Sequence, residues 1–475
     1  KKAELVLKNS NVINVFTNEI IKTDVAIEDG TIVGIGNYEG LEEIDLEGKY
    51  LSPGFIDGHV HIESSMVTPS EFAKAIVPRG TTTIIADPHE IANVKGIDGI
   101  KFILEDSKDI PLDVYVMLPS CVPATPFENS GAVLNAEELK GLINEERVLG
   151  LGELMNYPGV INGDKDVLEK ILLAQGKKID GHGPLIADKE LDAYVASGIS
   201  TEHECSTVEE MRNRLRLGMY ILIREGSAAK NLHELIKAVN KDDLRRCLFC
   251  SDDKHPEDIL IDGHMDYNIK LAIKEGIDPI DAVKMATLNS AECYGLKGKG
   301  AIAPGYAADL VVIDNLEDFN ILNVFKEGKL VGKDLKPLFN VSKTDTSSVS
   351  NTVNIKNLNL SDLEIKLNSN LVNVIGVEPH SLFTKKLNRE VKVEDGVFCY
   401  GNEDILKIVV VERHFATGNV GLGLVEGFGL KNGAIGSTIA HDSHNIIVIG
   451  DNDRDILLCI KGIEKMGGGA IIVSN

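Results

Sequence analysis

The chain has 475 residues, of which 43% are hydrophobic and 26% are charged, a composition typical of a soluble globular protein. This length exceeds one ordinary domain, and a barrel of about 250 residues with one or two smaller domains would fit. The formal net charge of −24 and the lack of a dense Lys/Arg cluster argue against nucleic acid as a partner.

Cysteine content and the N-terminal stretch bear on the compartment. The 7 cysteines are an odd number spread thinly over the chain, which indicates reduced thiols rather than a disulfide framework. The stretch KKAELVLKNSNVI lacks the apolar core of a signal peptide, and no run approaches the length that spans a bilayer. We therefore expect a cytoplasmic protein that acts on a small molecule, with no membrane partner. Because the chain starts at Lys1 without Met and stops just after the strand-like AIIV, we expect one or both ends to be incomplete.

Both flanks of the central region have the pattern of short strands. Residues 1–57 alternate apolar and polar positions, as in DVAIEDGTIVGIG, with turn residues between the runs, and residues 300–335 have the same character. We expect the two flanks to form one small β-sandwich-like domain beside the region that they enclose.

The pattern changes over residues 58–299, where short apolar runs alternate with amphipathic segments long enough for helices. Counted from FIDGHVH, there are eight strand candidates, and the other seven are TTTIIAD, LDVYVML, VLGLGEL, KIDGHG, ISTEHE, MYILIRE and CLFCSDD. That count and alternation predict the α/β class and a (β/α)₈ TIM-type barrel.

The remainder of the chain is expected to form a further domain. Residues 336–350 are polar and rich in Ser and Thr, so we interpret them as a linker. Residues 351–475 contain strand-like runs such as ILKIVVVE and NIIVIGD, which predict an extra C-terminal α+β domain.

The stretch PGFIDGHVHIESS contains His59 and His61, which lie two positions apart. On a strand, both imidazoles would project from the same face, and neutral imidazole is a common ligand for divalent cations. By itself this spacing also fits a pair of half-exposed strand histidines.

Acids and histidines recur where the predicted barrel strands end. They are His59 and His61, then Asp87 followed by His89 and Glu90, then Glu153, His182, His203 and Asp252. Each has a structural alternative, such as a turn residue for His182 or a helix cap for Glu153 and Asp252. Because the carboxyl ends of barrel strands face one shared site, their regular occurrence predicts a metal site there.

The motifs also carry a resemblance. The strings PGFIDGHVHIE and ATLNSAECYGLKGKGAIAPGYAADLVVID, with single histidines at the fifth and sixth strands, resemble the amidohydrolase superfamily of metal-dependent hydrolases. The strings GTTTIIADPHEIANV, GLGELMNYPGV, DGHGP, STEHE, CSDDKHP and IAHDSHNIIVIG are similar to its adenine deaminase branch. The resemblance covers nearly the whole chain, the C-terminal segment included.

The resemblance implies a binuclear centre of divalent manganese or iron, or of zinc. His59, His61 and Asp252 would hold one ion, and His182 and His203 the other. Glu153 stands where many relatives carry a carbamylated lysine, and its carboxylate could bridge the two ions without modification.

The implied reaction is hydrolytic deamination of adenine to hypoxanthine and ammonia, a step of purine salvage and adenine catabolism. Metal-activated hydroxide would attack C6, with Asp252 accepting its proton and passing it to the departing ammonia. A homo-oligomer is expected.

The roles of several polar residues stay open. Glu90 or His89 would serve as the acid near ring N1, but either could instead cap a helix or orient a metal-bound histidine. Asp87 and Glu63 are candidates for supporting the metal ligands or touching substrate. His441 and His444 could contact metal or substrate, although a solvent-facing loop also explains them.

Two other functions remain possible on the same fold. One is hydrolysis of a cyclic amide or an N-acyl amine, and the other is a catalytically silent scaffold. Cys247 and Cys250 lack a second ligand pair for a structural zinc site, so we interpret them as core residues of the eighth strand.

Overall fold

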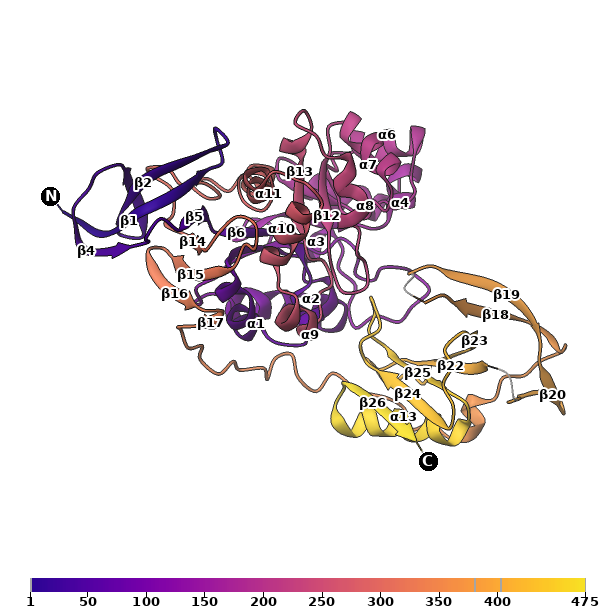
Figure 1. Ribbon diagram of the computed structural model, residues 1–475. Helices are drawn as coiled ribbons and strands as arrows, with labels where there is room; N and C mark the ends of the chain where they lie inside the picture. The colour runs from indigo at the N-terminus through magenta and orange to yellow at the C-terminus, as the bar shows by residue number, and fades with distance from the viewer. Residues whose placement is uncertain (1, 380–381, 402–403, 475) are drawn as a thin grey trace. The chain divides into compact units, whose positions relative to one another are not determined.

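The computed structural model describes residues 2–379, 382–401 and 404–474. It divides into two compact units (Figure 1). The first unit comprises Lys1–Pro88, Ile100–Cys121 and Asn135–Asp345, and the second comprises His89–Gly99, Val122–Leu134 and Thr346–Asn475. Among the described residues, no helix is both long enough and apolar enough to cross a membrane.

The two flanks of the first unit build one mixed β-sheet. Its strands in the described chain are β1 (Ala3–Asn14), β2 (Glu19–Glu28), β3 (Thr31–Ile35), β4 (Gly40–Asp45), β5 (Tyr50–Pro53), β14 (Leu310–Ile313), β15 (Ile321–Lys326), β16 (Lys329–Lys333) and β17 (Lys336–Pro337). The antiparallel pair β5–β14 joins the two flanks. Apolar residues from both flanks, among them Leu7, Leu51 and Leu310, share one buried core. The prediction of a small β domain built from both flanks is confirmed.

Residues 55–252, all described, contain the eight parallel strands of the barrel. These are β6 (Phe55–Val60), β7 (Thr81–Ala86), β8 (Asp113–Leu118), β9 (Val148–Leu154), β10 (Lys178–Gly181), β11 (Thr201–Glu202), β12 (Tyr220–Arg224) and β13 (Cys247–Cys250). Strands β6 to β10 pair in sequence order, as do β11 to β13. A parallel bridge between Val60 and Asp252 brings the last strand back to the first, so the predicted (β/α)₈ barrel is confirmed.

Helices connect and cover these strands. They are α1 (Pro69–Ile76), α2 (His89–Asp106), α3 (Ala136–Leu139), α4 (Tyr157–Asn162), α5 (Lys165–Leu173), α6 (Asp188–Ala196), α7 (Val208–Arg216), α8 (Leu232–Leu235), α9 (Pro256–Ile261), α10 (Met265–Lys274), α11 (Pro279–Met285) and α12 (Leu288–Tyr294). Helix α7 begins directly after Thr207, because Thr207 and Glu210 form a reciprocal capping box. Cys247 and Cys250 are buried in β13, as expected for core residues.

The barrel strands are buried along nearly their whole length, and every residue of β6, β7 and β13 is buried. Side chains within such strands must therefore be apolar or fully paired. Polar residues gather where the strands end, on the rim formed by their carboxyl ends.

The second unit contains a seven-stranded sheet and one long helix within its described residues. The elements are β18 (Leu371–Val377), β19 (Thr384–Glu390), β20 (Lys392–Glu394), β21 (Val397–Cys399), β22 (Ile405–Val411), β23 (Val420–Glu426), β24 (Gly433–Ser437), β25 (Ile446–Gly450), α13 (Asp453–Met466) and β26 (Ala470–Ser474). The sheet order is β19-β18-β23-β22-β25-β24-β26, and β20 pairs with β21. Ile456, Ile460 and Ile463 of α13 pack against Val409 and Val448 of the sheet.

The second unit also includes two segments that the sequence analysis assigned to the barrel, His89–Gly99 and Val122–Leu134. The side-chain amide of Asn445 donates to the backbone carbonyl of Asn129 (2.8 Å). The backbone N–H of Gly131 donates to the backbone carbonyl of Asn93 (2.6 Å). These long-range contacts explain why both segments cluster with the C-terminal residues.

A charged network joins the barrel and the small β domain within the first unit. Lys326 of β15 contacts Asp113 of β8 (2.8 Å) and Asp309 (2.9 Å), and Lys299 contacts the same two carboxylates (2.5 and 3.0 Å). Burial would raise the pKa of Asp113, but Lys326 and Lys299 outweigh it and hold this pKa below the ordinary value. The carboxylate therefore stabilises the fold when it is ionised.

We expect Asp113→Asn to lower the free energy of unfolding by about 1–2 kcal/mol at pH 7, because both lysines lose an ionised partner. A depressed folded-state pKa gives stability that is present above the unfolded-state value and lost as pH falls through the folded-state value. In urea unfolding, the difference from the parent should thus be smaller at about pH 2, well below the unfolded-state pKa, than at pH 7. Asp192→Asn, on the exposed face of α6, is the control, and an equal loss at both pH values would contradict the assignment.

Candidate metal centre

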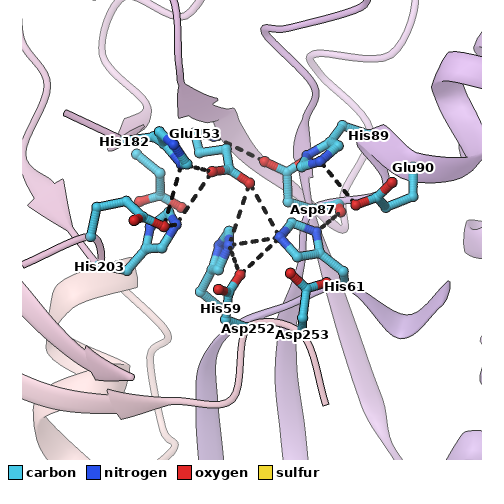
Figure 2. A network of polar contacts seen from close by, with 12 residues as sticks. His59, His61, Asp87, His89, Glu90, Glu153, His182, His203, Asp252 and Asp253 are labelled. Atoms are coloured by element: carbon cyan, nitrogen blue, oxygen red, sulfur yellow. Dashed lines mark hydrogen bonds and ion pairs between the residues drawn. The ribbon is translucent and has the colours of Figure 1, made fainter. Parts of the chain in front are cut away.

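Six side chains predicted from the strand ends converge at the rim of the barrel (Figure 2). His59 lies in β6 and His61 directly follows it, Glu153 lies in β9, and His182, His203 and Asp252 follow β10, β11 and β13. All but His182 are buried, and His182 is half-buried. The structure thus brings together residues that are up to 193 positions apart, as the barrel hypothesis requires.

One half of the cluster surrounds the first oxygen of Glu153. His61 Nε2 lies 3.2 Å from Glu153 Oε1 and 3.1 Å from Asp252 Oδ1. The corresponding distances from His59 Nε2 are 3.6 and 3.4 Å, and the two Nε2 atoms are 3.2 Å apart. These nitrogens and oxygens face a common point.

The other half surrounds the second oxygen of Glu153. His182 Nδ1 contacts Glu153 Oε2, and His203 Nε2 lies 3.3 Å from the same oxygen. The ring of His203 also stacks on that of His59, with centroids 4.3 Å apart. Glu153 therefore lies between two pairs of imidazoles, one at each oxygen.

The tautomer of His61 tests whether these groups suit a cation. His61 Nδ1 lies 2.9 Å from the carbonyl oxygen of Asp87, which can only accept a hydrogen bond. Nδ1 must therefore carry the hydrogen, and in the neutral ring Nε2 presents its lone pair to the cluster. Converging imidazole lone pairs and carboxylate oxygens are the donor set of divalent first-row metals, so the residues fit a pair of such ions.

Asp87 supports the cluster from the end of β7. Its Oδ2 accepts a hydrogen bond from the backbone N–H of Glu153 (2.9 Å), and its carbonyl orients His61. Gly152 allows this approach, because a Cβ there would lie 2.2 Å from Asp87 Oδ2. Asp87 thus positions two candidate ligands, His61 after β6 and Glu153 in β9.

Asp252 adopts an uncommon backbone conformation for a residue with a side chain. Its φ is 55°, in the left-handed region, where a non-glycine residue costs about 1–3 kcal/mol. The conformation is held in place because the N–H of Asp252 donates to the carbonyl of His59 (2.9 Å) and the N–H of His61 donates to the carbonyl of Asp252 (3.1 Å). These bonds fix the carboxylate beside the two histidines.

The sequence analysis missed two charged residues of the cluster, Arg224 and Glu204. Arg224 Nη1 donates to Asp252 Oδ2 (2.9 Å) and Arg224 Nη2 to Glu204 Oε2 (3.2 Å). Glu204 Oε1 in turn lies 3.5 Å from His203 Nε2. The signal was present, since Arg224 is the second-last residue of the seventh predicted strand, MYILIRE, and Glu204 directly follows His203.

The carboxylates raise the pKa values of the imidazoles. Burial alone would lower the pKa of His59, but hydrogen bonds to Asp252 and Glu153 raise it to about 10. Burial also opposes protonation of His182, and the charge of Glu153 raises its pKa to about 9. The cluster therefore attracts positive charge, which either protons or metal ions can supply.

The pKa values of the carboxylates are lowered, whereas those of the imidazoles are raised. Burial would raise the pKa of Glu153, but the charges of His182 and His203 hold it well below the ordinary range. Burial would likewise raise the pKa of Asp252, but hydrogen bonds from His59 and His61, when these rings are protonated, hold it well below its usual value. Both carboxylates are ionised at neutral pH and available as ligands.

The structure also describes the other candidates from the sequence. Glu63 is half-buried in a 3₁₀ turn (Ile62–Ser65) that follows His61. His89, Glu90, His441 and His444 belong to the second unit, where Glu90 contacts both His441 and His444. Burial would raise the pKa of Glu90, but the charge of His89 and hydrogen bonds from His441 and His444 hold it well below the ordinary range.

Comparison with known protein families finds two matches. Residues 50–331 match the amidohydrolase family, and residues 381–475 match the adenine deaminase C-terminal domain. The first match includes β5, β14 and β15 of the small β domain and the whole barrel.

Individual relatives match nearly the whole length of this chain. The chain is 56% identical to an adenine deaminase of Clostridium acetobutylicum, over 99% of this chain and 84% of the relative. It is 52% identical to adenine deaminase 2 of Carboxydothermus hydrogenoformans, over 100% of this chain and 84% of the relative. A crystal structure of an adenine deaminase, 16% identical, superposes with a TM-score of 0.53 over 70% of this chain and 100% of that chain, which supports the fold.

We expect Glu153→Gln to reduce the metal content of Mn²⁺-loaded protein from two ions per chain to one or none, because an amide cannot serve both halves of the cluster as a charged bridge. Elemental analysis after gel filtration measures this. The matched control is Glu225→Gln, which changes a buried glutamate in the next chain position after Arg224. Two retained ions in Glu153→Gln would contradict the bridging role.

Proposed function

The chain belongs to the amidohydrolase family, and on this premise we propose that it hydrolyses adenine to hypoxanthine and ammonia. The choice of substrate rests on the similarity of nearly the whole chain to relatives named adenine deaminase, a similarity that includes the C-terminal domain. The reaction converts one purine base into another, which places it in purine salvage and adenine catabolism.

The metal ligands follow from the two halves of the cluster. His59, His61 and Asp252 would hold one divalent ion, His182 and His203 would hold the other, and the carboxylate of Glu153, which faces both groups of histidines, would serve both ions. Manganese or iron is the proposed metal, with zinc as the alternative. Bound there, divalent cations would lower the pKa of water toward about 7, so that hydroxide is available at neutral pH.

Asp252 is the proposed proton carrier. Arg224 holds Asp252 Oδ2 at 2.9 Å, while Oδ1 faces His59 and His61. Oδ1 accepts the proton of the attacking water as the C6–O bond forms. It then delivers that proton to the amino group as the C6–N bond breaks and ammonia leaves. Arg224 is a positioning residue, because it fixes which oxygen faces the reaction.

Attack at C6 also requires a proton near ring N1, so that the ring accepts electron density. We propose that His89 or Glu90 supplies or controls this proton. The support is their place in the sequence, two and three residues after Asp87 at the carboxyl end of β7.

The compartment and assembly belong to the same proposal. None of the 7 cysteines, all of which lie in the described residues, forms a disulfide, which agrees with a cytoplasmic protein. A homo-oligomer is proposed from the family resemblance, and light scattering on the purified protein would measure its mass in solution.

We expect Asp252→Asn to lower kcat for ammonia release from adenine by about 10²- to 10⁴-fold, because the amide cannot accept the proton. Metal content must be measured on the same sample, since Asp252 is also a proposed ligand. Asp262→Asn, a change outside the cluster, is the control. Retention of most of the parental kcat would rule out Asp252 as the proton carrier.

The choice of substrate has its own test. The Mn²⁺- and Fe²⁺-loaded proteins are assayed for ammonia release from adenine, for ring opening of a dihydropyrimidine and for deacetylation of an N-acetyl amine. We expect only the first reaction. Ring opening or deacetylation without ammonia release would favour the cyclic amidohydrolase or deacetylase function, and a metal-free, inactive protein would indicate a scaffold.

A further inference from the structure

Five side chains that can bind protons or metals lie together in the second unit. His441 Nδ1 lies 2.5 Å from Glu90 Oε1, and His444 Nε2 contacts Glu90 Oε2. His89 Nε2 lies 3.3 Å from Glu90 Oε1 (Figure 2) and 3.6 Å from Asp442 Oδ1. Both oxygens of Glu90 therefore face imidazole nitrogens that belong to the C-terminal segment.

The hydrogen bonding of His444 distinguishes a metal site from a hydrogen-bonded cluster. The backbone N–H of Ala440 points to His444 Nδ1 (3.2 Å), which must accept this bond and so carries no hydrogen. The hydrogen of the neutral ring is then on Nε2, where it is donated to Glu90 Oε2. A cation would need the lone pair of Nε2, so the geometry favours a hydrogen bond over metal coordination.

Hydrogen bonds to the backbone hold both segments of the cluster in place, the one with His89 and the one with His444. His414 Nε2 donates to the carbonyl of Ser443 (2.9 Å), and the N–H of His444 donates to the carbonyl of Ala440 (2.8 Å). On the other side, the side-chain amide of Asn93 donates to the carbonyl of His89 (2.9 Å). Glu90 is only 3% exposed, so the orientation of its carboxylate is set by these neighbours rather than by water.

We propose that His441 and His444 are positioning residues, which hold the Glu90 carboxylate in place. The carboxylate accepts a hydrogen bond from His89 and thereby orients it. His89 is then the group that exchanges the proton near ring N1. This inference rests on the proposed adenine deamination and assigns the C-terminal domain a part in it. Glu90 acts through His89, because its two oxygens are already occupied by His441 and His444 while Oε1 also faces His89 Nε2.

The experiment compares His444→Ala, His444→Gln and His89→Gln in metal-loaded protein with adenine as substrate. His444→Ala should lower kcat about 10- to 100-fold with little change in KM or metal content, because His89 loses its fixed orientation. His444→Gln should recover most of the loss, since its side-chain N–H can still donate to Glu90. His89→Gln should lower kcat by about 10²-fold or more. The matched control is His233→Ala, which removes the exposed histidine of the His233–Glu275 pair (2.9 Å).

A second measurement does not depend on activity. The thermal midpoints of Glu90→Gln, His444→Ala and the double variant are compared by calorimetry. We expect the midpoint of the double variant to fall by less than the sum of the two single shifts, because both changes remove the same contact.

The outcomes separate this inference from the proposed function. A parent that releases no ammonia from adenine overturns both. An active parent with unchanged kcat in His444→Ala, or additive thermal shifts, overturns the inference alone. A third metal ion per chain that is lost in His444→Ala would also overturn it and identify the cluster as a metal site.

Discussion

The site depends on one buried carboxylate, that of Glu153, which lies between two pairs of imidazoles. A buried carboxylate is costly unless positive charge or hydrogen bonds compensate it. Here each oxygen faces its own pair, His59 and His61 at one and His182 and His203 at the other. Only a closed barrel brings the ends of β6, β9, β10 and β11 close enough for this arrangement, so fold and site share one requirement.

Charges alternate outward from that carboxylate. Glu204 contacts His203, Arg224 contacts Glu204, and Asp252 contacts Arg224 and the first histidine pair. Each buried charge therefore has an opposite neighbour, which offsets the cost of burial. This series of alternating charges leaves one oxygen of Asp252 facing His59 and His61, as the proposed proton transfer requires.

The sequence predicted the barrel and the convergence of the strand-end residues because both follow from local patterns. Strand spacing predicts eight strands, and the barrel then places their carboxyl ends at one rim. Arg224 was missed because a single arginine at a strand end usually reaches solvent, and only the structure shows it directed at Asp252. The grouping of Val122–Leu134 with the C-terminal residues depends on contacts such as that between Asn129 and Asn445, which no local pattern encodes.

A crystal structure of the Mn²⁺-loaded protein, with anomalous diffraction data collected at the manganese edge, tests the central claim most directly. The account predicts two anomalous peaks, one beside His59 and His61 and one beside His182 and His203, with an oxygen of Glu153 bound to each ion. A single peak that does not contact Glu153, or two peaks at other sites, would contradict it.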